Sequence, residues 1–60
     1  MQQIQIFRAA TSAFGTEGLV NRVNGWLSAH QFVYKETPEV RYYTDNDGET
    51  QTVMIIYKTD

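Results

Sequence analysis

The chain contains no cysteine and only one histidine. Disulfide bonds are therefore excluded, and the residue spacings of zinc sites are missing. No sequence pattern of a phosphate-binding loop or of a Ser-His-Asp enzyme is present either. We therefore expect no metal, no cofactor and no catalytic residue, and the sequence does not predict an enzyme.

Long apolar runs are also missing. No stretch reaches the 18 or so apolar residues that a membrane span requires, and the start Met1-Gln2-Gln3-Ile4 lacks the features of a signal peptide. The absence of cysteine fits a reducing compartment. The sequence therefore predicts a cytoplasmic protein without a membrane partner.

The chain is short. Its 60 residues allow a single domain, residues 1–60, and a domain of this size buries only about 60% of the surface that it exposes when unfolded. Hydrophobic residues nevertheless make up 42% of the sequence, which argues against disorder. With disulfides and metals excluded, we expect either a well-filled small core or a partner subunit.

Charge is unevenly distributed along the chain. The net charge is −2, and the acidic residues are concentrated after Lys35. Proteins that bind nucleic-acid backbones need clustered Lys and Arg side chains. The acidic second half therefore argues against broad phosphate binding.

Three segments have the composition of strands. Alternation of Ile4 and Ile6 with glutamines predicts a strand over 2–8, and an unbroken apolar run predicts a central strand over 50–58. Strand-forming residues also fill 32–44, where Pro38 indicates either a bulged edge strand or a strand that begins near 39. Residues 45–48, Asp-Asn-Asp-Gly, predict the turn that joins the last two strands.

One helix is predicted between the first two strands. Thr16 is a plausible N-cap, Glu17 suits the positive end of the helix dipole, and the helix should end near His30. Apolar residues recur at spacings of three and four and predict a stripe that packs on the sheet. The residues of this core stripe are Leu19, Val23, Trp26 and Leu27.

Together these elements predict an α+β fold with the order β-α-β-β. If the last strand is central, the strand order is 1-3-2, all neighbouring pairs are antiparallel, and the helix covers one face of the sheet. The alternative order places the first strand beside the second. Because the last strand is apolar throughout, its sequence does not show which alternate residues face the helix.

One helix leaves the other face of the sheet uncovered. We expect an apolar patch on that open face, and such patches usually mark interfaces. The sequence therefore predicts a protein–protein interaction or structural role, through a homodimer or another protein. The candidate interface residues are Phe7, Tyr42, Tyr43, Met54 and Ile56.

Four segments of the chain resemble a family in their order and spacing. They are residues 4–7 (Ile-Gln-Ile-Phe), 19–27, 41–44 (Arg-Tyr-Tyr-Thr) and 53–58, which ends in Tyr-Lys. This arrangement is similar to that of small, roughly 60-residue, sporulation-associated βαββ proteins of Bacilli and their relatives. The resemblance implies a small bacterial protein, and it transfers no catalytic residue.

Two other functions are compatible with the residues. Strand aromatics with nearby basic side chains could stack single-stranded nucleic acid, and a small-ligand site could form at a subunit boundary. The nucleic-acid interpretation would use Phe7, Tyr42, Tyr43 and Tyr57 with Arg8, Arg41 and Lys58.

Other polar residues have simpler explanations. His30 should contact the last carbonyls of the helix, and Asp45–Glu49 should form a solvated turn because it lacks the spacing of a calcium loop. Glu36 and Glu39 flank Pro38 and are expected to be solvated.

Overall fold

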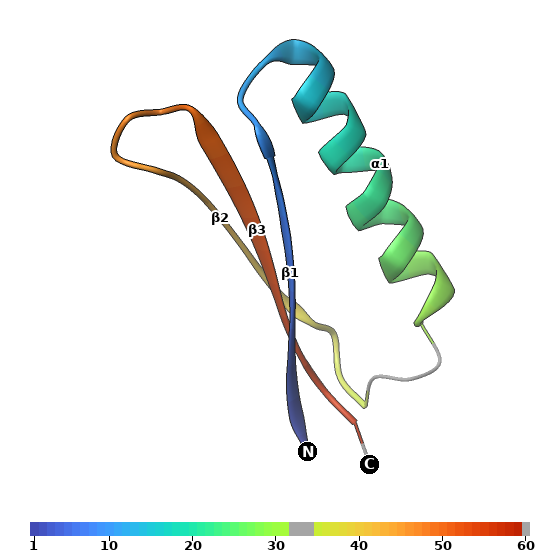
Figure 1. Cartoon of the computed structure of the whole chain (residues 1–60). Coiled ribbons are helices and arrows are strands. Elements are labelled where there is room, and N and C mark those ends of the chain that lie inside the picture. The colour runs from blue at the N-terminus through green and yellow to red at the C-terminus, as the bar shows by residue number, and fades with distance from the viewer. Residues whose placement is uncertain (32–34, 60) are drawn as a thin grey trace.

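The chain folds as a three-stranded antiparallel sheet with one helix on one side (Figure 1). The computed structural model describes residues 1–31 and 35–59. Its elements are β1 (Gln2–Ala10), α1 (Ala13–Ala29), β2 (Glu39–Thr44) and β3 (Thr50–Lys58). The strand order is β1-β3-β2, and both pairings are antiparallel. The predicted β-α-β-β fold and its 1-3-2 order are therefore confirmed.

The second strand begins where the shorter prediction placed it. β2 starts at Glu39, directly after Pro38, because proline cannot donate to a strand ladder. The part of the predicted segment at 32–34 lies outside the described residues. The turn after β2 is also confirmed, since the Gly48 N–H donates to Asp45 O at 2.9 Å and Gly48 has a φ of 72°. Glycine adopts this left-handed conformation without steric cost.

The helix begins one turn earlier than predicted, so the assignment of Thr16 as N-cap was wrong. Ser12 is the N-cap, and its hydroxyl accepts a hydrogen bond from the Gly15 N–H at 3.0 Å. The turn from β1 into α1 is tight, and a Cβ atom at Gly15 would clash with the Ala10 carbonyl. Thr16 lies inside the helix and donates to Ser12 O at 2.9 Å.

Loss of this cap should cost a measurable part of the stability. We expect Ser12→Ala to lower the free energy of unfolding by about 1 kcal/mol, because one N-terminal N–H loses its partner. Urea denaturation followed by circular dichroism measures the change. Ser28→Ala, an exposed serine within the same helix, is the matched control and should change the stability by less than about 0.5 kcal/mol. Equal losses in both variants would contradict the role of Ser12.

The core lies between α1 and the two strands β1 and β3. Leu19 and Val23 of the helix are buried together with Val53 and Ile55 of the central strand. Five half-buried residues pack around this cluster, namely Phe7, Ala9, Trp26, Leu27 and Tyr57. Of the predicted helix core stripe, Leu19 and Val23 are buried, whereas Trp26 and Leu27 are half-buried and pack against the core cluster.

The end of the helix is held by His30. Its backbone N–H donates to Trp26 O at 3.0 Å, and its Nδ1 lies 2.8 Å from the same carbonyl oxygen. The imidazole also stacks on the Trp26 indole, with ring centroids 4.2 Å apart. The predicted contact of His30 with a terminal carbonyl is therefore confirmed. Within the described residues, no helix is long and apolar enough to cross a membrane.

Candidate interaction surface

The register of the sheet determines which side chains share a face. In an antiparallel sheet, residues directly opposite each other point to the same side, and successive residues alternate. Val53, Ile55 and Tyr57 belong to the face under α1. The alternate residues of β3 therefore belong to the open face, which answers the question that the apolar sequence of this strand left open.

Four cross-strand rows make up the open face, and each is named here by its β3 residue. The Ile56 and Met54 rows lie at the centre, and the Lys58 and Thr52 rows flank them. From one end to the other, the rows are Gln2–Lys58, Ile4–Ile56–Glu39, Ile6–Met54–Arg41 and Arg8–Thr52–Tyr43.

The centre of this face is apolar. Ile4 and Ile6 are 53% and 42% exposed, and the half-buried side chains of Met54 and Ile56 lie between them and β2. On the opposite face of β1, the residues that alternate with the isoleucines include Gln3 and Gln5. Between Gln3 and Ile6, the first strand thus presents its isoleucines to the open face and its glutamines to the face that carries the helix.

The predicted interface set was partly misplaced. Tyr43, Met54 and Ile56 lie on the open face. Phe7 does not, because it is paired with Val53 and packs against the core under α1. The sequence reasoning also missed two residues of the open face, Ile4 and Ile6, although their alternation with the glutamines showed that they share one face.

Tyr42 was also misplaced. It is paired with Val53 and therefore lies on the helix side of the sheet, but it is 61% exposed because α1 covers β1 and β3 rather than β2. Its hydroxyl donates to Gln51 Oε1 at 2.9 Å. An apolar groove of about 220 Å³ remains between α1 and β2.

Charged side chains border the apolar centre of the open face. Arg41 Nε donates to Glu39 Oε2 at 2.9 Å, and the two side chains are 62% and 55% exposed. Lys58 Nζ lies 3.5 Å from Glu36 Oε1. Such exposed ion pairs contribute little to stability, in general up to about 1 kcal/mol. Their main effect here is to fix where positive and negative charge lie on the face.

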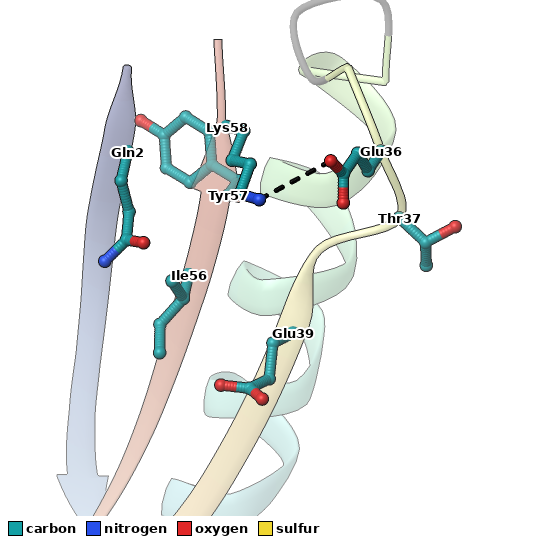
Figure 2. Close-up of a pocket in the computed structure, with 7 residues that line it drawn as sticks. All are labelled: Gln2, Glu36, Thr37, Glu39, Ile56, Tyr57 and Lys58. Carbon is teal, nitrogen blue, oxygen red and sulfur yellow. Dashed lines mark ion pairs between the residues drawn. The ribbon is translucent and has the colours of Figure 1, made fainter.

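A shallow hollow of about 220 Å³ lies at the Lys58 end of the sheet. Figure 2 shows that Gln2 and Ile56 border it on one side, while Glu36, Thr37 and Glu39 border it on the other. Tyr57 and Lys58 complete the lining. The hollow is open to solvent rather than enclosed, so it has the shape of a recess that a protruding side chain could enter.

The described residues offer little for catalysis or metal binding. Among them, no group of three or more His, Asp or Glu side chains could hold a metal ion. Every buried side-chain nitrogen or oxygen that the structure describes also has a hydrogen-bond partner.

Comparison of the chain with protein-family models, curated proteins and solved structures found no match. The resemblance to small sporulation-associated proteins therefore stays a prediction from the sequence.

Proposed function

We propose that the chain is a protein–protein interaction or structural module that acts as a homodimer through its open sheet face. The observation that carries this proposal is the orientation of β1. A strand that remained half solvated would place its isoleucines under the helix and its glutamines towards water. Here Ile4 and Ile6 lie with Met54 and Ile56 on the face opposite the helix, and a second copy packed on that face would shield them.

The size of the chain supports the same proposal. The described core has four buried hydrophobic residues, Leu19, Val23, Val53 and Ile55. A domain of about 60 residues with so small a core is marginally stable on its own. Burial of the open face against a second copy would remove further apolar surface from water at roughly 25 cal/mol per Å².

Nucleic-acid binding is less well supported. A base-stacking sheet needs several aromatic side chains on one face. Of the aromatic residues that the structure describes, Tyr43 lies on the open face, whereas Phe7, Tyr42 and Tyr57 belong to the helix side. The net charge of −2 also opposes binding to a phosphate backbone.

The solution mass of the protein tests the proposal. Light scattering across a dilution series should give twice the monomer mass of 6.9 kDa at high concentration and dissociation on dilution. Ile6→Lys should produce a folded monomer, because it places a charge at the centre of the open face while Ile6 is already 42% exposed in one copy.

Val20→Lys is the matched control, because Val20 is an apolar side chain of similar exposure on α1. This variant should dimerise like the original protein. A strict monomer at every concentration, or an Ile6→Lys variant that dimerises normally, would contradict the proposed role of the open face.

A further inference from the structure

We infer that the two copies pair about a two-fold axis that lies in the plane of the interface, at right angles to the strands, between the Ile56 row and the Met54 row. This inference rests on the proposed dimer and specifies its geometry. Each strand then lies over the same strand of the partner in the opposite direction. The Ile56 row of one copy faces the Met54 row of the other, and the Lys58 row faces the Thr52 row.

The apolar centre is self-complementary under this axis. Ile4 lies over the partner's Ile6, and Ile56 lies over the partner's Met54. Because both sheets are twisted, their strands cross at about 30° rather than running exactly in line. The two central rows lie nearest the axis and are displaced least by this rotation. The four central apolar positions of each copy therefore meet only apolar positions of the other.

The charges are complementary under the same axis. Glu39 belongs to the Ile56 row and Arg41 to the Met54 row, so Glu39 lies over the partner's Arg41 and the reverse contact also forms. Within one copy, Arg41 Nε donates to Glu39. The two terminal nitrogens of Arg41 donate no hydrogen bond to any described residue. Those nitrogens can bind the partner's carboxylate, which gives a network of four charges of alternating sign.

The remaining basic residues avoid one another. Arg8 lies over the partner's Gln2, and Lys58 lies over the partner's Thr52. Among the paired strand residues, none of the three basic side chains of the open face lies over another. Like charges placed directly opposite each other would weaken the dimer strongly.

The other two-fold axis in this plane runs along the strands, and it fails on the same criteria. It would place β1 over the partner's β2, so that Ile4 would cover the partner's Glu39 and Ile6 would cover the partner's Arg41. Each contact would desolvate a charged group against an apolar side chain without a compensating partner. Charge and hydrophobicity therefore select the axis at right angles to the strands.

The shape of the face agrees with this choice. Tyr43 lies in the Thr52 row on β2, and it is 43% exposed. The axis brings it over the partner's hollow, on the side where Figure 2 shows Glu36 and Thr37. A protruding tyrosine therefore meets a recess lined by carboxylates, to which its hydroxyl can donate.

Two charge-reversed variants test the geometry. Glu39→Arg gives a face with arginine at both positions, and Arg41→Glu gives a face with glutamate at both. Alone, each variant should dimerise at least about tenfold more weakly than the original chain, because like charges meet across the axis. An equimolar mixture should form a mixed dimer with one copy of each variant, since every contact at the axis is then between opposite charges.

Native mass spectrometry resolves the mixed dimer from the two homodimers by mass. Glu17→Arg, a reversal of an exposed charge on α1, is the control. It should dimerise as strongly as the original chain, and a mixture of the two should show no preference for the mixed dimer. Circular dichroism of each variant verifies that it is folded.

The possible failures can be told apart. If the original chain dimerises and Ile6→Lys abolishes the dimer, but the charge-reversed variants mix without preference, the open face is the interface and the proposed axis is wrong. If the original chain is a monomer at all concentrations, the proposed dimer itself is overturned.

Discussion

Replacement of Ile55 by alanine should leave most of the chain unfolded at 25 °C. Ile55 has an exposed fraction of 0% and lies in the central strand, against Leu19 and Val23 of the helix. Truncation of such a side chain costs about 2–5 kcal/mol, because apolar burial is lost and a cavity remains. A single core in a chain of this size supplies about 3–5 kcal/mol in total, so the loss consumes most of the stability.

Far-ultraviolet circular dichroism and urea denaturation measure this effect. Because dimerisation would stabilise the folded state by mass action, the original and variant chains must be compared at the same protein concentration. Val20→Ala removes apolar atoms from a side chain that is already 49% exposed, and it should change the stability by less than about 1 kcal/mol. A normal denaturation midpoint for Ile55→Ala would show that the core does not depend on this residue.

Substitution of Gln51 by leucine should cause the second large loss of stability. Gln51 is 1% exposed. Its Nε2 donates to Ala10 O and to Thr16 Oγ1, both at 2.8 Å, and its Oε1 accepts from the Tyr42 hydroxyl at 2.9 Å. This one side chain thus links the end of β1, the first turns of α1 and the edge strand β2.

Leucine fills a similar volume but cannot form these hydrogen bonds. We expect Gln51→Leu to lower the free energy of unfolding by about 2–3 kcal/mol, because all three hydrogen bonds are lost and each contributes about 1 kcal/mol. Tyr42→Phe removes a single hydrogen bond whose donor is already partly exposed, and it should cost about 1 kcal/mol or less.

Chemical denaturation of both variants gives the comparison. Gln31→Leu, which changes an exposed glutamine after the helix, is the control and should have an effect of less than about 0.5 kcal/mol. If Gln51→Leu were as stable as the original chain, the three hydrogen bonds would contribute nothing beyond what water supplies to the unfolded chain.

The strands and their order could be predicted because each depends on local signals. An alternating run indicated β1, the Asp-Asn-Asp-Gly turn indicated the hairpin, and Pro38 limited the start of β2. The start of the helix was predicted wrongly because several residues there can act as caps. Ser12 is the N-cap because the tight turn after β1 brings its hydroxyl to the Gly15 N–H, and this depends on the fold.

The composition of the candidate surface was harder to predict. In β3 every position from Val53 to Tyr57 is apolar, so its sequence contains no alternation that distinguishes the two faces. Phe7 was assigned to the wrong face, although it follows Ile6 directly and successive residues of a strand point to opposite faces. The role of Gln51 could not be predicted from the sequence, because it depends on hydrogen bonds to residues of three other elements.

The position of the central strand also has a consequence for synthesis on the ribosome. Both outer strands pair only with β3, which is the last of the three along the chain, and the β1–β3 pairs join residues as far apart as Gln2 and Lys58. No part of the sheet can form until residues 50–58 have left the exit tunnel. Until then, the isoleucines of β1 have no strand to pair with, and the nascent chain exposes them to other molecules. Formation of the sheet is therefore a nearly all-or-none event that waits for its last strand.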